Sequence, residues 1–587
     1  MGARLTRYRP AGTFLDPRVR MAVHDGLQEE TGDRTKLDAV LIVFVLIILL
    51  MRVYLAFVRE VNWDEFLNLS MVYDFRRGDM HQAFQTIFVH GFGWLSFVSS
   101  NEVDQIVAAR LVMLACGGAT AFFLFAIARK YVPFQAALFA VICYLSFSFV
   151  LTQANSFRTD QIALFCVMMA LWIQQCWSRS WVAVILVGVL IGLAGMVTIK
   201  SIFHMPMIGL LWLITCWRAE DRIRAFAQAA ASVLVALATL ACLFALHYAS
   251  LAEPESGFAF LQRTTGKTMG EGNLHHLSDY FVPALPTNIV FWVLLFVGVV
   301  WSMQRLFSDD CGHRIKALAL LAFSAPLATL LLYSEAFPYF YPFLLAPVAI
   351  LCGAGMTHPI LSHAGGRAVI ASVLFFLFSV HVSSALAHRN NYQRQLISVI
   401  HEIFPKPTPY IDRSSMVSTY PKKGFFMSRW GMAIYYEAGK PIMADIMRQD
   451  QPKFLVANRE MLYLDDYDVS EAGPQHANLF KQDMEVLRDN FVHHWGALYV
   501  LGKALKTGPH SEERAFEIYS DGPYTLEGAG QLMIDGALYT AGDVVKLTRG
   551  GHRYEGRDGE QQFILRWGEH LYRPSDPAPD QPVFRGF

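Results

Sequence analysis

The sequence predicts a polytopic α-helical membrane protein with a soluble domain at its C-terminal end. Of the 587 residues, 54% are hydrophobic and only 17% are charged, which is too little charge to cover a soluble protein of this length. Long apolar runs recur as far as residue 387, whereas residues 389–587 have ordinary polarity. The formal net charge is zero, so nothing in the composition indicates a nucleic-acid partner.

We expect about eleven transmembrane helices within residues 37–388, because a run of roughly 20 apolar residues is needed to span a bilayer. Several runs are short, and residues 316–356 can be divided in more than one way, so roughly ten to twelve spans agree with the pattern. The runs are 37–58, 106–128, 134–152, 162–177, 181–198, 203–217, 225–248, 288–303, 316–334, 338–356 and 368–387.

The basic residues predict the orientation in a bacterial inner membrane. If residues 1–36 form a cytoplasmic segment, most basic loops fall on the cytoplasmic side, as the positive-inside rule requires. The first apolar run is long enough to be a retained signal anchor, and an odd number of spans places residues 389–587 in the periplasm. The cytoplasmic groups are Arg129 and Lys130, Arg179, Arg218 to Arg224, Arg305 to Lys316 and Arg367; the exceptions are Arg59, Arg76, Arg77 and Arg158.

Three regions lie outside the predicted membrane. Residues 59–105 mix apolar clusters with charged residues, as short interfacial helices do, and residues 249–287 form a second periplasmic loop. Residues 389–587 predict a mixed α/β, β-rich domain, with α/β character before residue 490, because turn dipeptides separate strand-like runs. The predicted strands are Ala497–Leu501, Ala515–Tyr519, Gln531–Ile534, Val544–Leu547 and Gln562–Trp567.

An acidic pair, Asp64 and Glu65, follows the first predicted span in the segment Asn62-Trp63-Asp64-Glu65. Adjacent carboxylates at a membrane boundary are costly if they lose water, so they indicate a function. A carboxylate can act as general base on a hydroxyl that attacks an anomeric carbon. The alternative is a pair of solvated loop charges beside an interfacial Trp63, and for an acidic pair taken alone that alternative is the commoner case.

Cationic residues fall on the same predicted face. Arg158 and Asp160 lie in a short loop after the third span, where they form an ion pair or Asp160 caps the next helix. Lys200 ends the fifth span and suits a lipid-linked phosphate at the interface, although a snorkelling lysine fits equally well. Arg263 and Lys267 are weaker candidates for the same phosphate.

Aromatic residues mark the junction of the ninth and tenth spans. Tyr339 and Tyr341 lie in a Pro-broken segment that can line a sugar or prenyl cavity or form an interfacial aromatic belt, which base rates favour. The eight cysteines show neither a disulfide framework nor a CxxC metal pattern. The adjacent His275 and His276 leave a metal site open, and no metal or other cofactor is predicted.

Together these motifs resemble the GT-C glycosyltransferases. The acidic pair, the Arg-x-Asp loop, the Gly-rich helix ending in Lys200 and the aromatic Pro-Tyr junction follow in order on one predicted membrane face. The nearest group is the bacterial one that includes aminoarabinose transferases, protein O-mannosyltransferases and lipopolysaccharide-core galacturonosyltransferases, over residues 37–390. The resemblance implies transfer of a sugar, with inversion, from a polyprenyl-phosphate donor to an envelope glycan, a glycolipid such as lipopolysaccharide, or a protein.

The resemblance also implies roles for individual residues. Asp64 would be the catalytic base and Glu65 its support, or a residue that positions the acceptor. Asp160 would be a second active-site acid, oriented by Arg158, which alternatively binds phosphate. Lys200 would bind the donor phosphate, and Tyr339 or Tyr341 would line the donor pocket. The sequence departs from the family in its smaller number of spans than aminoarabinose transferases have, and no metal site or acceptor motif can be matched.

Rival functions predict different patterns. A transporter or lipid flippase would place ionisable residues near mid-membrane and repeat its halves, whereas the acids here gather at one face. A noncatalytic member of an envelope assembly, or an oligosaccharyltransferase-like enzyme of the same fold, are further alternatives. The sequence therefore favours a glycosyltransferase and leaves the sugar and the acceptor open.

Overall fold

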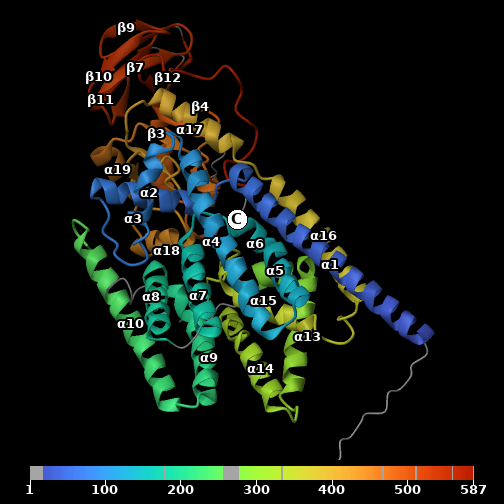
Figure 1. Ribbon diagram of the computed structural model, residues 1–587. Coiled ribbons are helices and arrows are strands. Elements are labelled where there is room, and N and C mark those ends of the chain that lie inside the picture. Colours follow the sequence, from blue (N-terminus) through green and yellow to red (C-terminus); the bar gives the residue numbers. More distant parts are fainter. Residues whose placement is uncertain are drawn as a thin grey trace, which may run out of the picture.

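The computed structural model describes residues 17–177, 180–254, 277–331, 333, 335–465, 469–508, 512–557 and 559–585, with side chains from Lys36 onward. Figure 1 shows a bundle of long helices on one side and a sheet-containing domain on the other. Short helices of the segment after α1 lie between the two parts. Helix α1 and helix α16 run side by side at one edge of the bundle, and α9 and α10 lie at the opposite edge.

Six helices among the described residues are long and apolar enough to cross a membrane, and a bent pair raises the number to seven. A multi-pass membrane protein is therefore confirmed, while eleven spans stay a prediction. The six are α1 (Pro17–Val58, apolar from Lys36), α4 (Glu102–Tyr131), η2 with α9 (Ile199–His204 and Met205–Arg218), α10 (Arg222–Ala249), α14 with η4 (Cys311–Ala322 and Ala325–Leu331) and α16 (Ala364–Leu386).

The remaining apolar helices are shorter or bent. The span predicted at 134–152 is broken at Phe147, whose backbone is not helical and separates α5 from α6. Helices α12 and α13 meet at an angle of 91°, because Asn288 has left the helical conformation between them. The bounds are α5 (Phe134–Ser146), α6 (Ser148–Gln153), α7 (Thr159–Cys176), α8 (Trp181–Val197), η3 (Leu277–Phe281), α12 (Val282–Thr287), α13 (Ile289–Arg305) and α15 (Phe340–Gly355).

Helix α15 forms the centre of the bundle, because every one of its residues is buried. It packs closely on α13 through glycines on both helices. A Cβ atom at Gly298 would lie 1.9 Å from the carbonyl oxygen of Leu351, and one at Gly355 would lie 2.4 Å from that of Leu294. The bundle thus depends on backbone contact at this crossing, as small residues allow in membrane helices.

The segment after α1 folds into α2 (Trp63–Arg77), α3 (Val89–Phe92) and η1 (Gly93–Phe97). Asn62 caps α2 by accepting a hydrogen bond from the Asp64 N–H at 2.9 Å, and Glu65 reciprocates by accepting from the Asn62 N–H at 2.9 Å. The helix ends at Gly78, whose φ of 80° is readily adopted by glycine. Strong signals at both ends therefore fix the position of this short helix.

The predicted C-terminal sheet domain is confirmed. Its larger sheet has eight strands in the order β10-β7-β12-β5-β3-β1-β2, with β4 paired to β5, and its smaller sheet has the order β6-β11-β8-β9. Strand β1 pairs in parallel with both β2 and β3, and the other pairings are antiparallel. The strands are β1 (Tyr410–Asp412), β2 (Lys422–Lys423), β3 (Phe454–Val456), β4 (Phe491–Trp495), β5 (Leu498–Lys506), β6 (Arg514–Ile518), β7 (Gly522–Glu527), β8 (Gln531–Ile534), β9 (Ala537–Thr540), β10 (Val544–Leu547), β11 (Gly550–Gly556) and β12 (Gln562–Trp567).

Helices surround the parallel strands, as the predicted α/β character before residue 490 requires. They are α17 (Asn391–Ile403), α18 (Arg429–Ala438), α19 (Met443–Asp450) and α20 (Lys481–Asn490), with short 3₁₀ turns at Glu460–Leu462, Val469–Glu471 and Pro474–His476.

The C-terminal domain is docked on the segment after α1. One hydrophobic core contains residues of α2 and α4 together with residues of α17, β1, β3 and the tail beyond β12. Polar contacts reinforce it: Glu102 accepts from the Thr419 N–H at 3.1 Å and lies 3.0 Å from His401 Nε2, and Arg394 bonds Asp104 at 2.9 Å. The domain is therefore held against α4 and against α2, the helix that carries Asp64.

Candidate active site

A chain of alternating charges lies where the helical bundle meets the C-terminal domain. Arg158 Nη1 donates to Asp64 Oδ2, and Arg158 Nε lies 3.3 Å from Asp160 Oδ2. Lys200 Nζ donates to Asp160 Oδ1 at 2.9 Å. These four residues, called the acid–base cluster below, come from positions far apart in the sequence.

Tyr339 lies against both cations of the acid–base cluster. The guanidinium carbon of Arg158 is 3.5 Å from the centre of the Tyr339 ring, and Lys200 Nζ is 4.9 Å from it. A cation over a tyrosine face is stabilised by the ring quadrupole. The structure therefore brings together five of the predicted site residues.

Each of these five residues stands at the end of a helix. Asp64 is in the first turn of α2, Arg158 precedes α7 and Asp160 is in its first turn. Lys200 is in η2, whose preceding Thr198 caps it through the Lys200 N–H at 3.4 Å, and Tyr339 precedes α15. Side chains at the ends of rigid helices keep a fixed relation to one another, which a binding or catalytic site needs.

Glu65 points away from the acid–base cluster and is fully buried. It forms a bidentate pair with Arg110 of α4, with distances of 2.8 Å from Nε and 2.6 Å from Nη2. Glu65 Oε1 also accepts the Phe157 N–H at 2.7 Å, and Asn68 donates to the Phe157 carbonyl at 2.7 Å. Two side chains of α2 thus bind the N–H and the carbonyl of Phe157, and they fix the backbone just before Arg158.

Neighbouring charges shift the pKa values of Glu65 and Arg158. Burial alone would raise the pKa of Glu65, but the Arg110 guanidinium and the Phe157 and Asn62 N–H groups outweigh it and lower that pKa below its usual value. Burial would likewise lower the pKa of Arg158, but Asp64 and Asp160 raise it above its ordinary value. The acid–base cluster contains two acidic and two basic side chains, so its formal charges cancel.

Besides Glu65, the described residues include one further predicted site residue, Tyr341. Tyr341 is fully buried inside the bundle, where its ring packs on Phe147 and Phe149, so it is not brought into the acid–base cluster. Arg263, Lys267, His275 and His276 lie outside the described residues. Within the described part of the chain, no group of three or more His, Cys, Asp or Glu side chains is arranged to hold a metal ion.

Several residues near the site gave no signal in the sequence. Arg110 lies inside an apolar run, and Arg413 and Arg459 lie in the C-terminal domain, about which the sequence motifs say nothing. The guanidinium carbon of Arg413 is 4.5 Å from the centre of the Trp63 ring, and that of Arg459 is 5.4 Å from it. Only the docking of the C-terminal domain on α2 brings these two cations beside Asp64.

Of two cavities in the helical bundle, only one lies near the site. One of about 460 Å³ lies between the end of α1, α6, α12 and the end of α16, and Arg59, Thr152, Tyr280, His381 and His388 are among its lining residues. It opens at the same end of the bundle as the acid–base cluster, since Arg59 and Glu65 share Arg110 as a hydrogen-bond donor.

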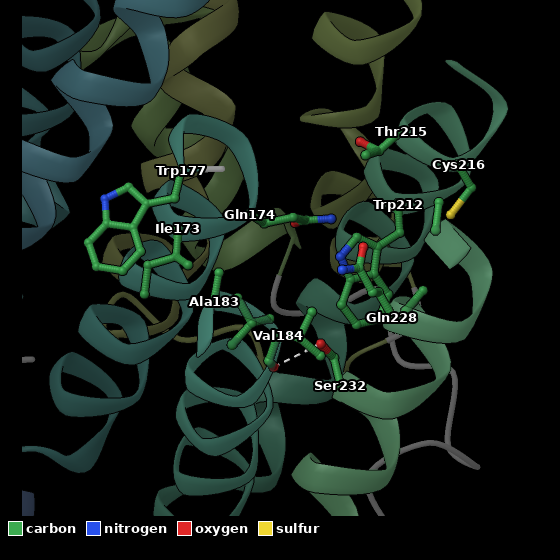
Figure 2. Close-up of a pocket in the computed structure, with 13 residues that line it drawn as sticks. Ile173, Gln174, Trp177, Ala183, Val184, Trp212, Thr215, Cys216, Gln228 and Ser232 are labelled. Carbon is green, nitrogen blue, oxygen red and sulfur yellow. Dashed lines mark hydrogen bonds between the residues drawn. The ribbon is translucent and has the colours of Figure 1, made fainter. Parts of the chain in front are cut away.

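A smaller cavity lies at the other end of α7 (Figure 2). It measures about 60 Å³ and is lined by Gln174, Trp212, Gln228 and Ser232, with Ser232 bonded to the Val184 carbonyl at 2.9 Å. Gln174 is fourteen positions after Asp160 on the same helix, which at 1.5 Å per residue separates them by about 21 Å. This cavity therefore takes no part in the site.

The chain has the fold of the GT-C glycosyltransferases, as the sequence motifs predicted. Residues 95–246 match the family model of dolichyl-phosphate-mannose-protein mannosyltransferases, a segment that contains Arg158, Asp160 and Lys200. The crystal structure of ArnT from Cupriavidus metallidurans bound to undecaprenyl phosphate superposes with a TM-score of 0.50 and 14% identity. That alignment covers 71% of this chain and 92% of ArnT.

Two other solved structures are similar more distantly. The oligosaccharyltransferase AglB from Archaeoglobus fulgidus, in complex with an inhibitory peptide and a dolichol-phosphate, aligns over 92% of this chain and 97% of its own at 9% identity and a TM-score of 0.48. The Pmt1–Pmt2 complex of S. cerevisiae, bound to its sugar donor, covers 41% of this chain and 36% of its own at 15% identity and a TM-score of 0.32. A comparison with curated protein sequences gives no match.

Proposed function

We propose that the protein transfers a sugar from a polyprenyl-phosphate donor to an envelope glycan or glycolipid on the periplasmic face, with Asp64 as general base. The observation that carries this proposal is the acid–base cluster, which holds a partly exposed carboxylate and two cations within one connected network. The ArnT structure, which has the same fold, binds undecaprenyl phosphate, and this supports a lipid-linked donor.

Asp64 fits the role of base better than Asp160 does. Its side chain is 21% exposed and is paired with one cation, whereas that of Asp160 is 4% exposed and is paired with both Arg158 and Lys200. A base has to reach the acceptor hydroxyl within hydrogen-bond distance, which a carboxylate enclosed by two cations cannot do. Asp160 instead holds Arg158 and Lys200 in position.

The two cations suit the departing phosphate. Arg158 and Lys200 are both held by Asp160, so a departing phosphate meets two cations that are already in position. Lys200 is 15% exposed and Arg158 is 14% exposed, so both can be reached from the site. Cations placed where charge develops lower the barrier most, because they need little reorganisation.

The proposed reaction is a single displacement. The acceptor hydroxyl oxygen attacks the anomeric carbon and forms the new glycosidic bond while the bond from that carbon to the phosphate oxygen breaks. The electron pair of the broken bond leaves with the polyprenyl phosphate, next to Arg158 and Lys200. The hydroxyl proton passes to Asp64. Attack from the side opposite the phosphate inverts the anomeric centre.

The test compares wild type with Asp64→Asn in donor turnover. Purified protein is mixed with radiolabelled undecaprenyl-phosphate sugars and extracted envelope glycans, and label in the glycan is counted. We expect Asp64→Asn to lose about 10²- to 10⁴-fold in turnover, which is the usual contribution of a general base. Asp79→Asn is the matched control, because Asp79 is an acid of the same segment with a 66% exposed side chain.

The outcomes separate the rival functions. If the wild type transfers label and Asp79→Asn matches it while folded Asp64→Asn does not, the glycosyltransferase proposal stands. Donor that is bound but never consumed by the wild type would point instead to a transporter, a flippase or a binding module. Equal turnover by wild type and Asp64→Asn would remove Asp64 from the role of base. Label in co-purified protein rather than glycan would identify a protein O-glycosyltransferase.

A further inference from the structure

Two arginines of the C-terminal domain meet at the Trp63 ring because of the sheet topology. Arg413 follows β1 and Arg459 lies just beyond β3, and these strands are parallel neighbours with Asp412 paired to Val456. The carboxyl ends of parallel neighbours meet at one edge of a sheet, where open α/β sheets commonly bind ligands. Both guanidinium groups therefore project from this edge onto the residue that precedes Asp64.

The loop that carries Arg413 is rigidly held. Asp412 is fully buried and accepts the Ser415 and Met416 N–H groups, each at 2.8 Å, and the Asn458 amide at 3.0 Å. Asn458 in turn accepts the Arg413 N–H at 3.2 Å. One buried network thus fixes the backbone on both sides of Arg413 and the residue that precedes Arg459.

Arg413 has an unused donor. Its side chain is only 8% exposed, and its Nε donates to the Met427 carbonyl at 2.9 Å. Its Nη1 is buried and has no hydrogen-bond partner among the described residues. A buried donor without a partner is costly, and such groups are uncommon in proteins. The missing partner is an acceptor group that the described residues do not supply.

A second positive charge, that of Arg459, lies close to Arg413. Burial, and then the neighbouring Arg459 charge, lower the pKa of Arg413 to about 10, so it stays protonated at neutral pH beside a second cation. The acid paired with Arg459 is Glu460, which is 69% exposed and lies at 3.1 Å, so solvent weakens that pair. Asp64, Glu460 and the buried Asp412 offset part of this positive charge, but among the described residues none of them forms an ion pair with Arg413.

We propose that Arg413, Arg459 and Trp63 form a subsite for an anionic group of the acceptor, a phosphate or a carboxylate, next to the hydroxyl that reacts. The planar guanidinium groups match the two oxygens that either anion presents. The buried Trp63 ring lies against both guanidinium groups and so helps to hold them beside Asp64. The acceptor is then a phosphorylated or uronic-acid-containing glycan rather than a neutral one.

The subsite is distinct from the donor phosphate position. Arg158 and Lys200 lie over Tyr339, whereas Arg413 and Arg459 lie over Trp63. Asp64 connects the two pairs, because it bonds Arg158 and directly follows Trp63 in the chain. The identity of the ligand as an acceptor rests on the proposed glycosyl transfer, whereas the binding of an anion at this place does not.

Binding of three short glycosides to the purified full-length chain tests the subsite without any turnover. The probes are octyl glucoside, its 6-phosphate and octyl glucuronide, titrated by calorimetry in the same detergent. We expect one anionic probe to bind at least about tenfold more tightly than the neutral one, because charge-assisted hydrogen bonds are the stronger kind. The anionic probe that binds more tightly shows whether the subsite prefers a phosphate or a carboxylate.

Variants locate the binding. Arg413→Gln should abolish the preference for the anionic probe, and Arg413→Lys should retain only part of it, because a lysine lacks the planar fork. Arg459→Gln, at a partly exposed position, should weaken the preference even if Arg413→Gln fails to fold. Arg553→Gln is the matched control, since Arg553 lies in the same domain with a 70% exposed side chain.

Two results would overturn the subsite. In the first, the wild type binds all three probes equally. In the second, the preference persists in both Arg413→Gln and Arg459→Gln. Failure of sugar transfer with anion binding intact would instead reject the proposed function and leave the subsite in place.

Discussion

Asp64 and Glu65 are neighbours in the chain, yet their carboxylates lie in opposite environments. Consecutive residues of a helix point about 100° apart, so at the start of α2 one faces the acid–base cluster and the next faces α4. Asp64 keeps contact with solvent, whereas Glu65 has all of its bonding capacity taken by Arg110, Phe157 and Asn62. The second acid of the pair thus holds the first and the Arg158 loop in place.

Glu65→Gln should therefore destabilise the protein rather than alter the chemistry alone. Removing one partner leaves the Arg110 charge buried without compensation, which costs roughly 3–5 kcal/mol. The measurement is the thermal unfolding midpoint in detergent, compared with Asp79→Asn at the surface of the same segment. An unfolding midpoint equal to that of the wild type would contradict the structural role of Glu65.

The same contact gives a pH dependence of known sign. The pKa of Glu65 is lowered on folding from its usual 4.5, so the folded protein holds the carboxylate charged more tightly than the unfolded chain does. The stabilisation is complete above about pH 4.5 and is lost as the pH falls through the folded pKa. The thermal unfolding midpoint of the wild type should fall as the pH is lowered from 7 to 3. The part of that fall that comes from protonation of Glu65 should be missing in Glu65→Gln.

Close packing of two helices at glycine residues positions the helix that leads to Lys200. Helix α8 leads directly into η2, which carries Lys200, and α8 packs on α10 through Gly188 and Gly192. A Cβ atom at Gly192 would lie 2.5 Å from the Ala236 carbonyl oxygen and 2.7 Å from Thr239 Cβ. Because backbone atoms cannot give way, the approach of these helices requires glycine.

Gly192→Ala should push α8 away from α10 and destabilise the protein by about 1–3 kcal/mol, as overpacking does. Because α8 precedes Lys200, the KM for the donor should rise as well. Gly209→Ala on α9 is the control, because a Cβ atom there would meet nothing within 4 Å and alanine favours helix. Thermal unfolding and donor titration measure both effects; a Gly192→Ala variant as stable as Gly209→Ala would contradict the close packing.

At the scale of the whole molecule, the C-terminal domain packs against the helix that carries Asp64. Its tail returns to α2, where the Phe584 ring lies 6.0 Å from both Trp63 and Phe66. The Arg585 N–H donates to Glu60 at 2.9 Å. The residues around Asp64 are therefore enclosed from one side by helices and from the other by this domain.

Phe584→Ala should loosen the tail from α2 and cost about 3–5 kcal/mol, as truncation of a buried aromatic ring does. We expect lower sugar transfer together with faster proteolysis of the tail, because Trp63 loses a packing partner. Tyr572→Ala is the control in the same tail, since Tyr572 is 46% exposed. If Phe584→Ala is proteolysed at the wild-type rate and transfers sugar at the wild-type rate, the contact of the tail with α2 does not support the site.

The sequence predicted the parts of the fold that depend on local pattern. Strands β8, β10 and β12 begin and end where the alternation and turns placed them, and Asp64, Arg158, Asp160 and Lys200 lie together as expected of residues on one membrane face. Tyr341 was harder to place than Tyr339, because the start of α15 at Phe340 decides which tyrosine faces the bundle. Arg413 could not be found, since only the parallel pairing of β1 and β3 and the docking on Trp63 bring it near Asp64.

The contact of the tail with α2 has a consequence for biosynthesis. Asp64 is made early in translation, but Phe584 and Arg585, which close over its segment, are made more than five hundred residues later. A nascent chain can insert its helices while this site is still open to solvent. A chain that stops before residue 583 keeps every member of the acid–base cluster and lacks the closure. Translation itself therefore delays the completed site until the ribosome has read through the C-terminal domain, so prematurely terminated copies carry the acids without the enclosure around them.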